Sequence, residues 1–160
     1  MKGEKKVIEA LSKILKNELT LINQYFVHAR MFRNWGLEKL NDYHYKQSIR
    51  VMKEADKLIE RVLFLEGLSN LQNLGKLPIG ENVVACLQGD LKNERDTQRP
   101  LLIEAIALCE ERQDYVSRDL LEELLEHSEE TIDWLETQQS LIENVTLPNY
   151  LQTHIEPGGD

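Results

Sequence analysis

The chain has 160 residues, the length of one domain that can bury a substantial core. Its 28 acidic residues outnumber its 19 basic ones, and the net charge of −9 argues against nucleic acid as a partner. No apolar run reaches the roughly 18 residues that a membrane span needs, so we expect no membrane partner. Cys86 and Cys109 have no CxxC spacing and form no disulfide framework, and no apolar secretory core follows the N-terminal residues. We therefore expect a cytoplasmic protein.

Apolar residues recur at three- and four-residue steps, which predicts long amphipathic helices. Helices are expected over about residues 4–35, 38–65, 82–112, 114–144 and 149–155. Gly36 and Gly67 follow the first two as stop signals, and Pro148 is suited to begin the last. The segment over about 67–81 is rich in turn-forming residues and is long enough to cross a bundle from end to end.

This pattern predicts an all-α fold, a four-helix bundle with one long crossover loop, in a single domain over residues 1–160. Pro100 lies inside the third expected helix, where a proline costs about 3 kcal/mol and removes a hydrogen bond. The apolar pattern resumes at Leu101, so we expect a kink or a local bulge there and no break in the chain's helical course.

Met52 stands among mostly charged neighbours in the second expected helix. Helical spacing places it on one face with Tyr45, Ile49 and Leu63. The first expected helix has a matching stripe, formed by Leu19, Ile22, Asn23, Phe26 and Arg30. A single methionine on such a stripe is commonly a gap filler of an ordinary core. It can also be a thioether ligand to iron in a flat apolar slot, and the spacing leaves both interpretations open.

Several blocks of the sequence resemble the bacterioferritins, in that family's order and spacing. These blocks are residues 22–36, 59–67, 70–77, 114–119, 132–136 and 149–152. The resemblance covers nearly the whole chain, with one apparent extra residue between Asp96 and Leu101 that favours a bulge before Pro100. It implies a ferritin-like bundle with a short fifth C-terminal helix, in a hollow iron-storage cage of twenty-four subunits.

The resemblance also implies a haem site. Met52 would be the axial ligand of the iron of haem b, with one haem per two subunits and one Met52 from each. The slot around it keeps family-like residues at Leu19, Ile22, Asn23, Phe26, Tyr45, Ile49 and Lys53. Apolar walls suit haem, and paired thioether ligation favours the reduced state of the iron. Lys53 is either a partner of a haem propionate or a solvated lysine.

Ferritin-like di-iron sites take one Glu from each of two helices and a Glu-x-x-His pair from each of the other two. The resemblance implies that Glu18 and Glu94 are the first two ligands. The other four ligand positions hold residues that differ from those of the family: Val51, Glu54, Ser128 and Thr131. Both imidazoles are therefore missing, and the chain is expected to have no catalytic residues of its own. Glu18, Glu54 and Glu94 remain as a remnant that could hold one cation weakly.

Two further positions are consistent with a di-iron centre that has lost its ligands. Where relatives bind a second iron on the cavity wall, this chain has Lys46 and Arg50, which repel iron and can neutralise the remaining carboxylates. His127 lies about 100° around its helix from the position of a bridging carboxylate, so we expect it to stay outside the site. His28 and His44 are expected to be ordinary core or surface residues.

The expected function is that of a haem-binding bacterioferritin subunit that does not oxidise iron alone and shares a mixed cage with a ferroxidase-competent companion subunit. A small ferredoxin would dock around residues 68–75 when stored ferric iron is reduced. Two alternatives stay open. One is an independent ferroxidase with a rebuilt site, formed by Glu18, Glu54, Glu94 and either Glu129 or Glu130. The other is a haem-carrying cage that stores no iron.

Overall fold

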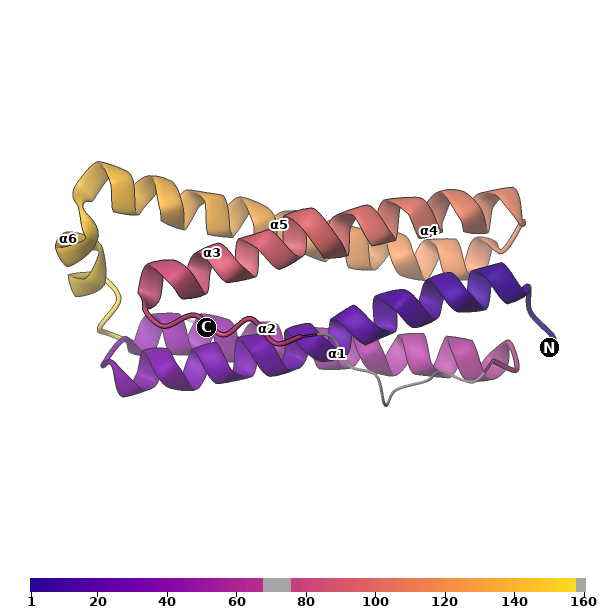
Figure 1. Cartoon of the computed structure of the whole chain (residues 1–160), viewed down its shortest axis with the longest axis horizontal. Coiled ribbons are helices and arrows are strands. Elements are labelled where there is room, and N and C mark those ends of the chain that lie inside the picture. The colour runs from indigo at the N-terminus through magenta and orange to yellow at the C-terminus, as the bar shows by residue number, and fades with distance from the viewer. Residues whose placement is uncertain (68–75, 158–160) are drawn as a thin grey trace.

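The computed structural model describes residues 1–67 and 76–157, and the regular elements in these two ranges are all helices (Figure 1). The elements in chain order are α1 (Lys5–Asn34), α2 (Glu38–Phe64), α3 (Val83–Asn93), the π-helical turn η1 (Glu94–Gln98), α4 (Arg99–Glu111), α5 (Tyr115–Val145) and α6 (Leu147–Gln152). Because α3, η1 and α4 follow one another without interruption, they form the third long rod of a four-helix bundle. The expected all-α bundle with a short C-terminal helix is confirmed.

The bundle consists of two helical pairs, α1 with α2 and the α3–α4 rod with α5, and α6 lies across one end (Figure 1). The turn between α1 and α2 passes through Gly36, whose φ of 79° is a left-handed conformation that glycine adopts at no steric cost. The amide of Leu37 donates to the carbonyl of Phe32 at 2.9 Å and closes the end of α1. Of the predicted crossover over 67–81, residues 68–75 lie outside the described residues, as does the expected ferredoxin docking segment.

Two large apolar clusters fill the bundle, one toward each end, and Leu21, Tyr25 and Val51 form a small third cluster. The first joins α1, α2, α4 and α5 through buried side chains that include Val7, Leu11, Leu58, Leu102 and Leu121. The second joins α1, α2, α3 and α5 to α6, through side chains that include Phe32, Leu40, Leu87, Leu135 and Tyr150. Each fully buried leucine or phenylalanine contributes about 1.5–3 kcal/mol. The buried side chains between the two clusters are mostly polar, and they form the candidate site.

The bulge expected before Pro100 is confirmed as the π-helical turn η1. Pro100 lies in the first turn of α4, directly after this π-helical turn. The first and last residues of the turn, Glu94 and Gln98, are both buried in the polar middle of the bundle. Single π-turns inside α-helices are frequent at functional sites.

The last helix begins earlier than predicted, at Leu147, with Pro148 in its first turn. It is attached to the bundle by two polar contacts. The hydroxyl of Tyr150 donates to Gln138 Oε1 at 2.7 Å, and the amide of Lys39 donates to the carbonyl of His154 at 3.1 Å. Within the two described ranges, none of the helices combines the length and the apolarity of a membrane-crossing segment.

Candidate functional site

The six positions matched to iron ligands converge midway along the bundle. These residues are at most 4% exposed and come from all four rods: Glu18, Val51, Glu54, Glu94, Ser128 and Thr131. They occupy the polar layer between the two apolar clusters. The positions that the resemblance assigns to iron ligands therefore lie together in this structure.

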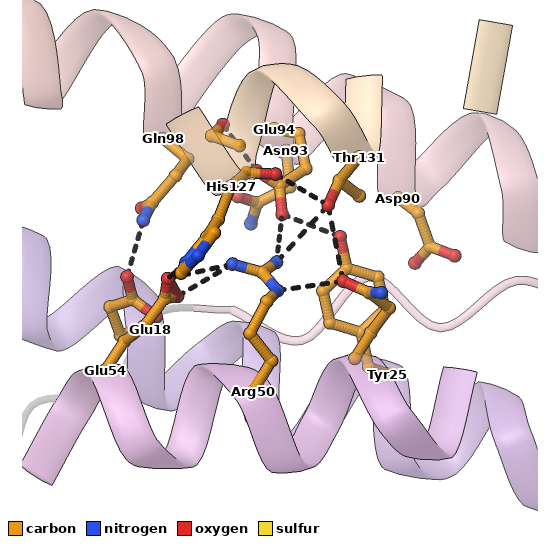
Figure 2. A network of polar contacts seen from close by, with 12 residues as sticks. Glu18, Tyr25, Arg50, Glu54, Asp90, Asn93, Glu94, Gln98, His127 and Thr131 are labelled. Atoms are coloured by element: carbon orange, nitrogen blue, oxygen red, sulfur yellow. Dashed lines mark hydrogen bonds and ion pairs between the residues drawn. The ribbon is translucent and has the colours of Figure 1, made fainter. Parts of the chain in front are cut away.

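The guanidinium of Arg50 lies inside this pocket (Figure 2). Its Nη1 donates to both carboxylate oxygens of Glu54, at 2.8 and 2.9 Å. Its Nη2 lies 3.7 Å from Glu94 Oε1 and 3.4 Å from Thr131 Oγ1, and its Nε donates to Gln47 Oε1 at 2.9 Å. Arg50 therefore neutralises the carboxylates of Glu54 and Glu94, as the sequence led us to expect.

Glu94 has a hydrogen-bond donor on each oxygen. The hydroxyl of Tyr25 donates to Oε1 and that of Ser128 donates to Oε2, both at 2.7 Å. Burial raises the pKa of Glu94, while the nearby Arg50 guanidinium lowers it. Burial also raises the pKa of Tyr25, which keeps the phenol protonated as a donor. The two oxygens that a metal would use are thus occupied by hydroxyl groups of the chain.

Glu18 is tied to a chain of amides. Its Oε1 accepts from Gln98 Nε2 at 2.7 Å (Figure 2). Gln98 Oε1 in turn accepts from Asn17 Nδ2 at 2.7 Å. Its Oε2 is buried without a hydrogen-bond partner among the described residues. Burial, and then the charge of Glu54, raise the pKa of Glu18 well above its ordinary value. The protein thus favours the neutral acid at this position.

Met52 lies outside the bundle core, 49% exposed on the α1–α2 pair, so the interpretation of it as a core gap filler is wrong. Phe26 and Tyr45 are similarly exposed, at 44% and 40%, and their ring centres lie 6.4 Å apart. The guanidinium of Arg30 stacks 5.1 Å from each of these rings. We call the predicted slot the Met52 face, made of Leu19, Ile22, Asn23, Phe26, Tyr45, Ile49, Met52 and Lys53. In it Leu19, Ile22 and Ile49 are half-buried, and Asn23 and Lys53 are exposed.

An accessible thioether among apolar side chains fits a haem iron ligand, because sulfur binds the iron and apolar surface covers the macrocycle. The face is open on one side. A haem placed on it would be enclosed only by a second apolar surface.

The sequence matches the ferritin-like domain family over residues 8–145. It is 42% identical to a bacterioferritin of Brucella melitensis over 160 residues, which cover all of this chain and 99% of that protein. The chain belongs to the bacterioferritins. It is also 43% identical to a bacterial ferritin of Synechocystis, over 97% of this chain and 99% of the relative. A bacterioferritin of Rhodobacter capsulatus is 46% identical over 91% of this chain and 89% of the relative. Iron storage is the function of this family.

The carboxylates of this bacterioferritin are arranged for pairing within the chain. Among residues 1–67 and 76–157, no three His, Cys, Asp or Glu side chains are grouped so that they could hold a metal ion. Glu18, Glu54 and Glu94, the positions of the expected remnant cation site, thus form no such group. The physical reason is Arg50, whose guanidinium contacts both Glu54 and Glu94.

His127 was expected outside the site, and this expectation is wrong. Its Nδ1 lies 2.9 Å from Glu54 Oε2 (Figure 2). An ionised carboxylate only accepts hydrogen bonds, so Nδ1 carries the proton and donates it. Residue 127 points away from the bridging position on α5, but its imidazole is long enough to reach Glu54 on α2.

The rebuilt ferroxidase site loses two of its proposed ligands. Glu129 is exposed and accepts from Arg99 Nε at 2.9 Å on the surface of the bundle. Glu130 is also exposed. Neither side chain belongs to the buried pocket, so an independent site that includes one of them is not formed.

This bacterioferritin has a second buried polar cluster, which the sequence does not predict. Asp90, His28 and His44 have fully buried side chains, and the Asp90 oxygens lie 2.9 Å from His28 Nδ1 and 2.8 Å from His44 Nε2. The amide of Gly80 donates to His28 Nε2 at 3.0 Å. Burial acts to raise the pKa of Asp90, but the hydrogen bonds of both imidazoles outweigh it and hold that pKa below its ordinary range. The cluster fastens the end of the crossover to the bundle. His28 and His44 are 62 and 46 residues from Asp90 in the sequence, so no local spacing indicates this cluster.

Proposed function

We propose that this chain is a haem-carrying bacterioferritin subunit whose own di-iron pocket is closed by an arginine. The observation that carries the proposal is the Arg50 guanidinium bound to Glu54 and facing Glu94 inside the pocket. The subunit would store and release iron as part of a cage, while oxidation of ferrous iron would take place in a companion subunit.

Charge and ligand chemistry both support a pocket that does not bind or oxidise ferrous iron. A guanidinium stays protonated at every physiological pH, so it is a permanent cation where ferrous ions would have to enter. Burial opposes its charge, but Glu54 and Glu94 outweigh that effect and raise the pKa of Arg50 further. Valine at position 51 offers no ligand atom, and the hydroxyls of Ser128 and Thr131 are poor ligands for ferrous iron in neutral form.

The haem proposal rests on the Met52 face. A second copy of the chain that presented its own face would supply the opposite apolar wall and the second thioether. When bound, haem would supply a one-electron carrier. The chain's residues would hold it: Met52 by its sulfur, Phe26 and Tyr45 by their exposed rings, and Lys53 by a charge suited to a propionate. A small ferredoxin would deliver the electron when stored ferric iron is reduced.

The test uses the purified protein made of this chain alone. We expect haem to bind at one per two chains, and we expect no rapid oxidation of ferrous iron when oxygen is mixed with protein loaded anaerobically. A fast phase that consumes two ferrous ions per chain would overturn the proposal and favour an independent ferroxidase. Iron content of the native protein isolated from iron-rich cells separates the remaining alternative, because a haem carrier without storage would be nearly iron-free. Counting distinct subunits in that preparation by mass would show whether a companion is present.

A further inference from the structure

A pocket of about 460 Å³ lies between α1, the segment before α3, and the α3–α4 rod, away from the Met52 face. Four lysines line it, two from α1, one from the segment before α3 and one from α3: Lys13, Lys16, Lys76 and Lys92. No aspartate or glutamate is among the residues that line it. We call it the lysine pocket. It has a local charge opposite in sign to the net charge of −9 of the chain.

The four lysines make no ion pair with any residue in the described parts of the chain. Residues 68–75, next to Lys76 in sequence, contain no acidic residue that could neutralise them. Lys13, Lys76 and Lys92 are exposed and Lys16 is half-buried. Four ammonium groups around one concave surface create a positive potential that raises the local concentration of small anions. The same four charges exclude a divalent cation.

The wall of the pocket also offers a fixed hydrogen-bond donor. Asn17 and Asn93 bind each other reciprocally, at 2.9 and 3.1 Å, and Asn17 also donates to Gln98. Asn93 Nδ2 thereby uses one of its two hydrogens, and the second has no acceptor among the described residues. This amide pair is held in place, so a ligand oxygen would find its donor already oriented.

We propose that the lysine pocket binds a small oligophosphate, an anion with two or more linked phosphate groups. All the cations of the pocket are lysines, which bind phosphate as point charges. The volume exceeds what one phosphate fills and suits a linked pair or triple. The strongly negative chain repels long polyanions, which favours a small ligand.

The experiment titrates pyrophosphate into protein freed of iron, because phosphates also bind ferric iron, and follows the heat of binding at constant ionic strength. We expect saturation at one pyrophosphate per chain. The triple variant Lys13→Gln, Lys16→Gln, Lys92→Gln should bind at least about tenfold more weakly, since each lost charge pair contributes a fraction of the binding free energy. The matched variant Lys2→Gln, Lys5→Gln, Lys39→Gln has the same net charge and should bind within about twofold of the parent.

A variant without any charge change locates the ligand. Gly89 lines the pocket, and an added Cβ would have only ordinary contacts, the nearest at 3.6 Å. Gly89→Leu should therefore fold, and its side chain should occupy part of the pocket and weaken pyrophosphate binding. Four results would overturn the proposal: no saturation at millimolar pyrophosphate, equal weakening in both lysine variants, unchanged binding to Gly89→Leu, or citrate binding as tightly as pyrophosphate.

Discussion

Arg50 reaches one turn along α2 and donates from a single nitrogen, Nη1, to both carboxylate oxygens of Glu54, at 2.8 and 2.9 Å. The pair is almost enclosed, with Glu54 5% and Arg50 20% exposed at their side chains. This contact converts a ligand position into half of an internal ion pair. It explains how the bundle tolerates three buried glutamates in its middle without a metal ion to balance them.

Removing the guanidinium should destabilise the protein strongly. Arg50→Met keeps much of the apolar stem but leaves Glu54 and Glu94 buried without their cation, which we expect to cost about 3 kcal/mol at pH 7. Urea unfolding measures the change. The matched variant is Arg95→Met, since Arg95 is an exposed arginine paired with Asp96, and it should stay within about 0.5 kcal/mol of the parent. An Arg50 variant as stable as the Arg95 variant would show that the carboxylates do not need this cation.

Glu18 should make the protein less stable as the pH rises. Burial raises its pKa in the folded protein, so the folded state holds the proton after the unfolded chain, with an ordinary pKa near 4.3, has released it. The folded state is therefore favoured below that value and loses stability as the pH increases toward the raised pKa. Glu18→Gln removes this dependence and can still accept from Gln98, so we expect a gain of about 1–2 kcal/mol at pH 8 and little change at pH 4.

Unfolding midpoints of the Glu18→Gln variant at the two pH values test this. Glu9→Gln, a change at an exposed position of the same helix, is the control and should alter neither midpoint. A Glu18→Gln protein that is less stable than its parent at pH 8 would contradict the account, because it would mean that the ionised carboxylate is stabilised by a partner or a metal.

Much of the fold could be predicted from the sequence, because it depends on the spacing of apolar residues and on the glycines and prolines at the helix ends. The four rods follow the three- and four-residue steps of apolar residues, and the π-turn follows from Pro100 and the extra residue before it. The exposed position of Met52 could not be predicted from spacing, since a stripe at helical spacing looks the same on a core face and on an interface.

The sequence predicted which residues lie in the buried polar site, but only some of the contacts between their side chains. The resemblance predicted Arg50 as a possible counter-charge, because this cation stands where relatives have a ligand of cavity-wall iron. The contact of His127 with Glu54 was missed, because it depends on how closely α2 and α5 approach. The cluster around Asp90 and the lysine pocket were missed for the same reason: residues from separate rods meet only in three dimensions.

Met52→Leu should abolish haem binding and leave folding intact. Leucine fills nearly the same volume without the sulfur, so the stability cost should stay under about 1.5 kcal/mol. Haem absorbance per chain, together with the melting temperature, gives both readouts. Met31→Leu replaces a half-buried methionine of the second apolar cluster and should keep full haem binding. Haem retained at one per two chains in the Met52 variant would contradict the ligand assignment.

Zinc should not stabilise the iron-free protein through the buried pocket. A metal at 100 times its dissociation constant adds about 2.7 kcal/mol to the stability of the folded state. That would raise the melting temperature by several degrees in a chain of this size. We expect no such rise, because Arg50 holds the carboxylates that zinc would need. A rise that disappears in Glu54→Gln would place a bound metal in the pocket and refute this expectation.

Restoring the missing ligands should restore oxidation only if the arginine is also removed. The four changes Val51→Glu, Glu54→His, Ser128→Glu and Thr131→His complete a set with Glu18 and Glu94. Within each helix the new pair has the i, i+3 spacing that places both side chains on one inward face. With Arg50 retained, the guanidinium still fills the pocket, so the quadruple variant should stay inactive. Adding Arg50→Ala clears that space, and ligands of one cluster act as a unit, so activity should appear only in this fivefold variant.

The most direct measurement is stopped-flow absorbance after oxygen is mixed with anaerobically loaded protein, comparing the parent, the quadruple variant and the fivefold variant. We predict a rapid phase that oxidises two ferrous ions per chain in the fivefold variant alone. Rapid two-iron oxidation by the parent, or by the quadruple variant at the rate of the fivefold one, would show that Arg50 does not close the pocket.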